Sequence, residues 1–481
     1  MSNKKTNSET TCDSCEPNFD LLIIGAGSAG FSAAIRASEI GAKVGLIEGG
    51  VIGGTCVNEG CVPSKTLIRA AEIRHRSTHH SFRGVETLQG NLSWSDIRAQ
   101  KDELVEALRQ AKYRDVLKSY PGIKYIEGKA RILQSNEVEL SHGAKLKAEK
   151  LLITTGARPW VPPIQGLNDI GFLDSTSAMN LDSLPKSMII LGGSAVGLEL
   201  AQMFSRLGVR ITVIEVASRI VPLEDADIGD ALTKYLEEEE ITIHTGVKIL
   251  SVKRNSRGYQ VVTENNNTPQ TIDADQLLVA TGRRPNTEDL GLSEIRVEVG
   301  SKGHILTNEY LQTDNPNIYA AGDCTTEAAF VYVAAYSGNL AADNALQGHN
   351  RKFDISVLPK VTFTDPQVAS VGLTEEQAKA KGINAISAKL NFDHVPRALA
   401  ARDTRGFIKL VADKDTGKLL GAHILAPEGG ELIEIPTLAM KFGIGVKDLA
   451  TTFFPYLTQT EAIKLCAQTF NKDVSKLSCC A

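Results

Sequence analysis

The chain has 481 residues, a length that favours two to four domains over a single core. Its hydrophobic content of 42% and charged content of 23% are those of an ordinary globular protein, and a net charge of −5 provides no basic surface for nucleic acid or anionic lipid. The longest apolar stretch, residues 19–35, is too short and too interrupted by glycine to span a bilayer. These features predict a cytoplasmic protein with no nucleic-acid or membrane partner.

Residues 1–17 are polar and are expected to form a flexible tail. The two lysines in this segment are not followed by an apolar stretch, so it does not resemble a signal peptide. Cys12 and Cys15 form a CxxC pair that could capture a metal ion. Because no second pair completes a zinc site, an incidental pair is the favoured interpretation. Cys324 and Cys466 have no sequence partner and are expected to be packing residues.

Residues 19–50 have the pattern of a strand, a glycine-rich turn, a helix and a second strand that ends in an acid. Gly25, Gly27 and Gly30 form GxGxxG, which allows a tight turn, a close approach of the backbone to a pyrophosphate and close helix–strand packing. Glu48 lies where a carboxylate can accept hydrogen bonds from a ribose diol. Together these features predict a dinucleotide-binding fold.

The stretch GGTCVNEGCVPSKTLIRA follows, and four residues separate its cysteines, Cys56 and Cys61. Pro63 suits the first turn of a helix, which residues 64–76 continue. The dipole of such a helix lowers the pKa of a thiol at its N-terminus, and Lys65 adds positive charge. A zinc site would need two further ligands near by, so the pair favours redox chemistry. An amphipathic helix is expected further on, around residues 94–120.

A second nucleotide-binding pattern occupies residues 187–222, with Gly192, Ser194 and Gly197 at the three turn positions. Glu215 ends the next strand and favours NADH, because an acid repels a 2′-phosphate. Arg219 could partly offset that repulsion, so the choice between NADH and NADPH stays open.

Three further apolar strands end in turn signals. Two of them, at residues 151–156 and 277–282, end in Thr-Gly and suggest chain crossings between the two nucleotide folds. The third, at residues 317–323, ends in Gly-Asp. Asp323 could hold a hydroxyl of the first dinucleotide, and a surface turn is an equal alternative.

Over essentially its whole length the chain resembles the flavoprotein pyridine nucleotide-disulfide oxidoreductases, through CVNEGC, the turns GAGSAG and GGSAVG, and YAAGD. The resemblance implies FAD in the first fold, NAD(P)H in the second, and a C-terminal domain that forms a homodimer with shared active sites. Electrons would pass from nicotinamide through flavin to a Cys56–Cys61 disulfide. Cys61 would face the flavin, Cys56 would be the interchange thiol, and Lys65 would pair with Glu199 beside the flavin.

The implied cofactor contacts form two sets. The flavin set comprises Gly25, Gly27, Gly30, Glu48, Gly50, Thr55, Lys65, Ala130, Gly156, Asp323 and Val331. The nicotinamide set comprises Gly192, Ser194, Gly197, Glu199, Glu215 and Gly282.

Near the C-terminus, disulfide-reducing members of this family carry an acid–base His–Glu pair. Here Tyr456 stands at the position of the histidine, while Glu461 remains. A phenol with an ordinary pKa near 10 is a poor proton shuttle at neutral pH. Disulfide reduction is therefore disfavoured, and a site with several thiolates and a phenol suits a soft, thiophilic metal ion.

Residues 453–481, 330–338 and 395–411 resemble the mercuric reductases of that family. The resemblance implies reduction of Hg(II) to Hg(0), with Hg(II) arriving on small thiols. Cys479 and Cys480, on the tail of one subunit, would deliver the ion to the active-site cysteines of the other. The N-terminal metal-binding domain of many members is not expected here.

Tyr113 and Tyr456 match two tyrosines near the metal in that group, although Tyr113 could also be a helix-surface aromatic. Glu59 stands where valine is usual, and we expect it to point outward. The alternative activity is that of a dihydrolipoyl dehydrogenase or another disulfide reductase. A metal-storage protein is disfavoured, because storage needs no nucleotide folds.

The expected fold is α/β, with two Rossmann-like domains and a C-terminal α+β dimerisation domain. Its segments are the tail (1–17), the FAD domain in two parts (18–160 and 286–355), the NAD(P) domain (161–285) and the dimerisation domain (356–481).

Overall fold

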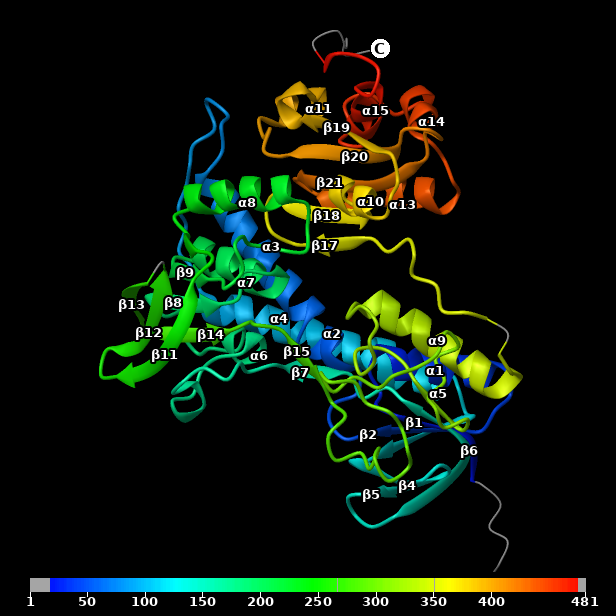
Figure 1. Cartoon of the computed structure of the whole chain (residues 1–481). Coiled ribbons are helices and arrows are strands. Elements are labelled where there is room, and N and C mark those ends of the chain that lie inside the picture. The colour runs from blue at the N-terminus through cyan, green and yellow to red at the C-terminus, as the bar shows by residue number, and fades with distance from the viewer. Residues whose placement is uncertain (1–17, 266, 350, 475–481) are drawn as a thin grey trace, which may run out of the picture. The chain divides into compact units, whose positions relative to one another are not determined.

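The computed structural model describes residues 18–265, 267–349 and 351–474 (Figure 1). Its internal contacts divide the chain into two compact units. The first is formed by residues 18–58, 105–158 and 283–353, and the second by residues 59–104, 159–282 and 354–474, apart from the gaps just given.

The first unit is built on a parallel sheet in the order β3-β2-β1-β6, and β16 also pairs with β6. The antiparallel strands β5 and β4 extend it from the start of β6. Strand β1 is buried at all but one position, as expected for a parallel strand covered on both faces. The strands are β1 (Phe19–Ile24), β2 (Val44–Glu48), β3 (Ile123–Glu127), β4 (Ala130–Gln134), β5 (Glu137–Leu140), β6 (Lys145–Ile153) and β16 (Ile318–Ala320).

Helices α1 (Ser28–Glu39) and α9 (Val331–Gln347) lie side by side in this unit (Figure 1). A Cβ on Gly338 would lie 2.0 Å from the Ala29 carbonyl oxygen, so glycine allows this close approach. Because β2, β1, β6 and β16 are parallel, their carboxyl ends share one edge of the sheet. In open parallel sheets that edge is where ligands bind.

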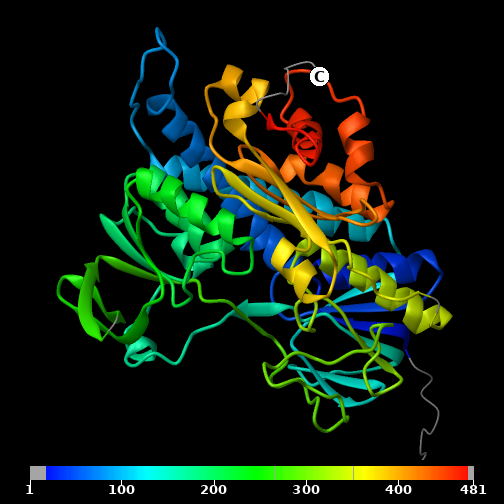
Figure 2. The same ribbon diagram turned by 45° about the horizontal axis from the view of Figure 1, so that its top comes forward.

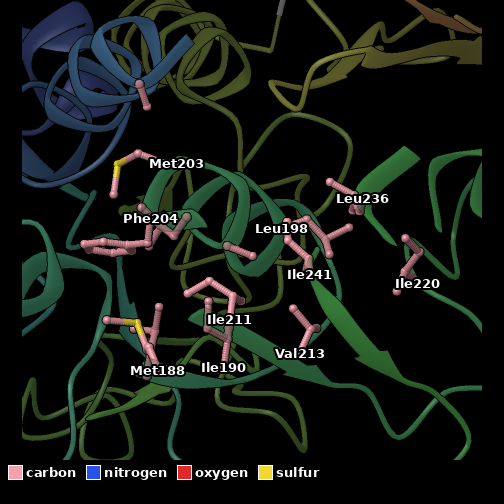
Figure 3. Close-up of a cluster of buried hydrophobic side chains, with 14 of the residues drawn as sticks. Met188, Ile190, Leu198, Met203, Phe204, Ile211, Val213, Ile220, Leu236 and Ile241 are labelled. Carbon is pink, nitrogen blue, oxygen red and sulfur yellow. The ribbon is translucent and has the colours of Figure 1, made fainter. Parts of the chain in front are cut away.

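The second unit contains a parallel sheet in the order β10-β9-β8-β14. Apolar side chains of β8 and β9 pack against α7 and α8, and Figure 3 shows Ile190 and Ile211 facing Leu198 and Phe204 within this core. The elements are β8 (Ser187–Leu191), β9 (Arg210–Ile214), β10 (Thr242–His244), β14 (Gln276–Val279), α7 (Ala195–Arg206) and α8 (Ala226–Glu238). An antiparallel sheet of β11 (Lys248–Asn255), β12 (Gly258–Asn265) and β13 (Thr268–Ala274) lies between β10 and β14 in the chain.

An antiparallel sheet in the order β17-β18-β21-β20-β19 completes this unit, and helices α13 and α15 pack against it (Figure 2). Its strands are β17 (Lys360–Thr362), β18 (Gln367–Gly372), β19 (Ala385–Asn391), β20 (Phe407–Asp413) and β21 (Leu419–Ala426). The helices are α10 (Glu375–Ala380), α11 (Pro396–Ala401), α12 (Gly429–Leu432), α13 (Glu434–Lys441), α14 (Val446–Thr451) and α15 (Glu461–Gln468).

The predicted fold class is confirmed: two parallel, Rossmann-like sheets and one antiparallel α+β region are present. The strands before the two Thr-Gly turns are β6 and β14. The helix expected around residues 94–120 is interrupted, since α4 (Trp94–Arg109) runs into a π-helix, η1 (Gln110–Arg114), before α5 (Asp115–Lys118). Over the part of the chain that the structure describes, no helix is both long and apolar enough to cross a membrane.

Candidate functional site

The first glycine-rich turn joins β1 to α1. Gly25 has a φ of +108°, and a Cβ at this position would lie 2.4 Å from the Thr154 carbonyl oxygen. A Cβ on Gly30 would lie 1.8 Å from the Gly25 carbonyl oxygen, so only glycine allows the helix to approach the turn this closely. Thr154, which sequence reasoning missed, fixes the turn by donating its hydroxyl to the Gly25 carbonyl over 2.9 Å.

Glu48 ends β2 beside this turn. Its Oε2 accepts a hydrogen bond from the Ala26 amide at 2.7 Å, and its Oε1 accepts one from the Gly50 amide at 2.8 Å. Gly27 is the N-cap of α1 and provides no side-chain cap. The first-turn amides of α1 are therefore available to an anion, and the carboxylate is held at the position expected for a ribose contact.

The second turn, between β8 and α7, repeats this geometry. Gly192 has a φ of +112°, and a Cβ on it would lie 2.4 Å from the Ala280 carbonyl oxygen. A Cβ on Gly197 would lie 2.0 Å from the Gly192 carbonyl oxygen. Ser194 is the N-cap of α7, and its hydroxyl makes no capping hydrogen bond. At both turns the space that a side chain would occupy is left open beside the backbone amides of a helix N-terminus. Both turns therefore fit a dinucleotide pyrophosphate.

The two redox-candidate cysteines lie on consecutive helices. Cys56 belongs to the short helix α2 (Gly54–Asn58), and Cys61 is the first residue of α3 (Cys61–Thr78), with Pro63 in its first turn as predicted. Both cysteines are half-buried. The N-cap of α3 is Gly60, which provides no side-chain cap, so the positive end of an 18-residue helix faces Cys61. Glu59 is exposed, as expected.

The turn before Cys56 packs directly on the first nucleotide turn. A Cβ on Gly54 would lie 2.6 Å from Gly27 Cα, and a Cβ on Gly53 would lie 3.3 Å from Tyr113 Cε2. The Tyr113 ring also contacts Phe31 of α1 edge-on, with 4.8 Å between the centroids. The structure therefore brings Tyr113, Cys56 and the first nucleotide turn together in one unit.

Asn58 is a further residue of this region that sequence reasoning missed. Its amide group donates to the Gly54 carbonyl at 2.8 Å and to the Ile52 carbonyl at 3.0 Å, and its Oδ1 accepts from Arg109 Nε at 2.8 Å. Arg109 ends α4 directly before the π-helix that carries Tyr113. Asn58 thus ties the cysteine turn to the tyrosine-bearing helix. Asn58 lies inside the recognisable motif CVNEGC, but its partner Arg109 is 51 residues away in the sequence. The hydrogen bond between them therefore could not be predicted.

The predicted ion pair between Lys65 and Glu199 is present. Lys65 Nζ lies 2.6 Å from Glu199 Oε2 and 4.6 Å from the centroid of the Phe363 ring. Glu199 is only 6% exposed, and its other oxygen accepts a hydrogen bond from the Phe363 amide at 2.9 Å. The pair joins α3 to α7, and its place beside a flavin stays a prediction.

Asp323 follows β16, at the same sheet edge as the first nucleotide turn. Burial raises the pKa of Asp323, and the nearby Arg283 guanidinium opposes that rise. Arg283, which was not predicted, also donates to Thr55 Oγ1 at 3.4 Å. Glu327 is near by, and burial raises the pKa of its carboxyl group to about 7.

The remaining predicted cofactor contacts occupy the ends of elements. Ala130 begins β4, and Val331 begins α9, whose N-cap lacks a side-chain cap. Gly156 has a φ of +66° and accepts a hydrogen bond from the Asn286 amide at 2.9 Å, whereas Gly282 has a φ of +129° and accepts one from Trp160. These positions stay predictions as ligand contacts.

Tyr456 and Glu461 both belong to the second unit. Tyr456 is 52% exposed, whereas Glu461, the first residue of α15, is 7% exposed. Glu461 Oε2 has no hydrogen-bond partner within the described residues. Cys324 and Cys466 are fully buried, and burial raises the pKa of each thiol to about 12, which confirms them as packing residues.

The proposed metal-capturing cysteines lie outside the described residues: Cys12, Cys15, Cys479 and Cys480. Within residues 18–265, 267–349 and 351–474, no group of three or more His, Cys, Asp or Glu side chains is arranged to hold a metal ion. The described part of the chain therefore offers cysteine thiols, not a resident metal centre.

Comparison with known protein families finds a match in each of two regions of the chain. The family described as pyridine nucleotide-disulphide oxidoreductase matches residues 19–338, and the dimerisation domain of that family matches residues 358–467. The first match spans the predicted FAD and NAD(P) domains without separating them. The domain boundaries given above therefore stay predictions.

Individual relatives are similar along nearly the whole chain. A mercuric reductase of Lysinibacillus sphaericus is 48% identical over 466 residues, covering 97% of this chain and 85% of that protein. A mercuric reductase of Streptomyces lividans is 47% identical over 468 residues, covering 96% and 98%. Among solved structures, the HOCl-induced flavoprotein disulfide reductase RclA from Escherichia coli matches with a TM-score of 0.84 at 30% identity, covering 94% of this chain and all of that one.

Proposed function

The chain belongs to the mercuric reductase group of the pyridine nucleotide-disulphide oxidoreductase family and is an FAD-dependent oxidoreductase, and we propose that it reduces Hg(II) to Hg(0) with NADH or NADPH. The reaction is balanced, because the nicotinamide gives up a hydride, Hg(II) takes its two electrons and the remaining proton goes to solvent. The observation that carries the proposal is similarity to mercuric reductases along 96–97% of the chain, in a protein with Tyr456 at the histidine position.

Cys56 and Cys61 are the proposed ligands of Hg(II) during reduction. Soft thiolates are the ligands that soft metal ions prefer. The uncapped N-terminus of α3 favours the thiolate form of Cys61, and both side chains are half-buried and so accessible to an incoming ion.

The other residues around these thiols have positioning roles in this proposal. Bound FAD would accept the hydride and supply the electron pair. Lys65, held by Glu199 and Phe363, presents a fixed positive charge one turn along α3 from Cys61. Tyr113 packs on the turn before Cys56, and its phenol and that of Tyr456 are proposed to lie near the metal ion.

Cys479 and Cys480 are proposed to take Hg(II) from small thiols and pass it to the active site of the partner subunit. Thiolate-bound metal ions move by ligand exchange, which adjacent thiols on a chain end can perform in steps. The dimerisation-domain match over residues 358–467 supports a homodimer, which this delivery requires. We place the reaction in the cytoplasm, where the nicotinamide and thiol pools reside.

Reduction of an organic disulfide is the second candidate function, because RclA is described as a disulfide reductase. That chemistry needs a group that protonates the leaving thiolate near neutral pH. At the corresponding position this chain has Tyr456, which is 52% exposed, in place of the usual histidine. A phenol with an ordinary pKa near 10 is a poor donor of that proton at neutral pH. Hg(II) reduction needs no such proton transfer and is the favoured activity.

The test is nicotinamide oxidation by the purified holoenzyme with Hg(II) in excess thiol as the electron acceptor, compared with lipoamide and with glutathione disulfide as acceptors. We expect turnover with Hg(II) and little with the disulfides. Cys56→Ser and Cys61→Ser should each abolish Hg(II) turnover while FAD stays bound. The double change Cys479→Ala, Cys480→Ala should cause a large loss of activity on thiol-buffered Hg(II) with unchanged flavin spectra. Cys466→Ala is the control and should keep that activity, because this thiol is buried and donates to the Ala388 and Ile408 carbonyls. Robust disulfide turnover without Hg(II) turnover would favour the second candidate.

A further inference from the structure

The turn before Cys56, formed by Ile52, Gly53 and Gly54, takes its shape from one side chain. Gly53 has a φ of +101° and Gly54 a φ of +62°, so two successive residues adopt conformations that favour glycine. The carbonyls of Ile52 and Gly54 both face the amide group of Asn58, which donates to them over 3.0 Å and 2.8 Å. Two carbonyl oxygens that face one point need a donor there that satisfies both. The turn therefore depends on Asn58.

Arg109 fixes the orientation of the Asn58 amide. Its Nε donates to Asn58 Oδ1 at 2.8 Å, and because a guanidinium has no acceptor, only the oxygen of the amide can face it. The NH₂ group of Asn58 is thereby directed to the two carbonyls of the turn. The Arg109 side chain is only 20% exposed, and a hydrogen bond from a charged donor is stronger than one between neutral groups. Arg109 thus holds the turn through Asn58.

Arg109 is in turn held by Glu106, which lies one turn earlier on α4. Arg109 Nη1 donates to Glu106 Oε2, and Arg114 Nη1 donates to the other oxygen of that carboxylate at 2.9 Å. These three side chains span the π-helix η1, from the turn before it to its last residue. Tyr113 lies on this π-helix, and π-helical turns are frequent at functional sites. The network therefore braces the segment that carries Tyr113.

Gly53 connects the two parts of this arrangement. A Cβ on it would lie 3.3 Å from Tyr113 Cε2 and 3.4 Å from Asn58 Nδ2, so the glycine lies between the tyrosine ring and the amide. On its other side the Gly53 amide donates to the Ala26 carbonyl of the first nucleotide turn at 2.9 Å. The turn before Cys56 is thus fixed at the nucleotide turn by backbone and at Asn58 by side chains.

From these contacts we propose that Arg109 is a positioning residue of the redox site. Acting through Asn58, it holds the turn before Cys56 against Tyr113, so that the Cys56 thiol keeps one place. Arg109 does not bind the metal ion in this account, because its guanidinium is engaged by Asn58 and Glu106. The inference rests on the proposed function only for the ion that Cys56 binds, since the reactivity of the thiol can be measured without Hg(II).

The first test measures that reactivity in the dithionite-reduced holoenzyme, with iodoacetamide as the probe and no Hg(II). Cleavage after Glu59, which lies between the two cysteines, separates Cys56 from Cys61, and mass spectrometry follows the alkylation of each. In Arg109→Gln the released turn should expose Cys56, so its rate constant relative to that of Cys61 should rise about tenfold. An unchanged ratio would overturn the proposal.

Arg114→Gln is the matched control for this measurement. It removes a second hydrogen bond to Glu106 on the same π-helix, but the Arg114 side chain is 48% exposed and its printed contacts are with Glu106 and Gln110, not with Asn58. The ratio of the two alkylation rates should stay as it is in the unmodified protein. A rise as large as that in Arg109→Gln would show that the helix had loosened as a whole, and the specific role of Arg109 would be wrong.

The second test asks whether Arg109 acts through Asn58. Asn58→Ala should raise the alkylation ratio by itself, and it decides the matter should Arg109→Gln fail to fold. The double variant Arg109→Gln, Asn58→Ala should match Asn58→Ala alone, because Arg109 then has no amide to orient. Additive effects of the two changes would mean separate routes and would contradict the proposal.

Turnover of thiol-buffered Hg(II) provides the third readout. Arg109→Gln should lower kcat about tenfold and leave KM within about twofold, because the thiols still bind the ion but are misplaced for the electron transfer. An unchanged kcat would overturn the positioning role. If the unmodified holoenzyme formed no Hg(0) at all, the proposed function would fail, while the alkylation ratio would still decide on Arg109.

Discussion

His75 shows what the structure adds at the scale of a single residue. Its ring stacks on His79 with 4.2 Å between the centroids, and its Nε2 lies 4.0 Å from Glu239 Oε1. Burial lowers the pKa of His75 to about 4, with the charge of Arg206 acting in the same direction and Glu239 opposing it. The residue is therefore neutral in the folded protein at a pH where it would be protonated in the unfolded chain.

This difference predicts a specific pH dependence of stability. Below pH 6.5 the unfolded chain takes up a proton at His75 that the folded protein does not bind until about pH 4, so folded stability falls as the pH falls through this window. After allowance for partial exposure of the ring, the loss between pH 7 and pH 5 should be about 1 kcal/mol. Urea unfolding at the two pH values should show His75→Gln losing less stability on acidification than the unmodified protein. His142→Gln, at an exposed turn, is the control; equal losses in all three proteins would refute the account of His75.

Single residues also mark the limit of sequence reasoning. The exposure of Glu59 and the Lys65–Glu199 pair could be predicted, because Glu59 and Lys65 lie in or next to the recognisable motif CVNEGC. The place predicted for Tyr456 near a metal ion stays a prediction. The bonds from Arg109 to Asn58 and from Arg283 to Thr55 could not be predicted, since they join residues 51 and 228 positions apart. Such contacts depend on how elements pack and leave no local pattern.

At the scale of elements, the two strand–turn–helix units were the most predictable features. Each consists of an apolar parallel strand, a small-residue turn and a helix, whose patterns can be recognised locally. The π-helix at Gln110–Arg114 was not predicted, because the apolar pattern of residues 94–120 is that of a continuous amphipathic helix. A single wider turn rotates the residues that follow it about the helix axis, so it changes the face of the helix on which Tyr113 lies. The amino-acid pattern gives no sign of this change. The exact start of α3 at Cys61, directly after Gly60, likewise could not be located from hydrophobic periodicity.

The close approach of α7 to its turn predicts the effect of a single methyl group. In Gly197→Ala the new Cβ would lie 2.0 Å from the Gly192 carbonyl oxygen, so the helix or the turn must move. We expect a loss of about 1–3 kcal/mol in the free energy of unfolding and a clear weakening of ADP-ribose binding. Gly90→Ala adds the same methyl group where no atom lies within 4 Å and is the control. Unchanged ADP-ribose affinity in Gly197→Ala would show that this packing does not shape the nucleotide site.

For the molecule as a whole, the sequence indicated two nucleotide folds and a dimerisation region, and the family matches agree over residues 19–338 and 358–467. The predicted site residues divide between the compact units: Cys56, Tyr113, Glu48 and Asp323 lie in the first, and Cys61, Glu199, Glu215 and Tyr456 in the second. The proposed delivery of Hg(II) by Cys479 and Cys480 requires, in addition, a second subunit.

The central claim is that two electrons from each nicotinamide reach one Hg(II) ion. The most direct measurement sweeps volatile Hg(0) from an anaerobic reaction of the holoenzyme with thiol-buffered Hg(II) and counts it against NADH consumed. The account predicts one Hg(0) for each NADH oxidised, because both half-reactions transfer two electrons. It also predicts no Hg(0) from Cys56→Ser, Cys61→Ser protein that retains its FAD. Steady NADH oxidation with no Hg(0) collected would contradict the account.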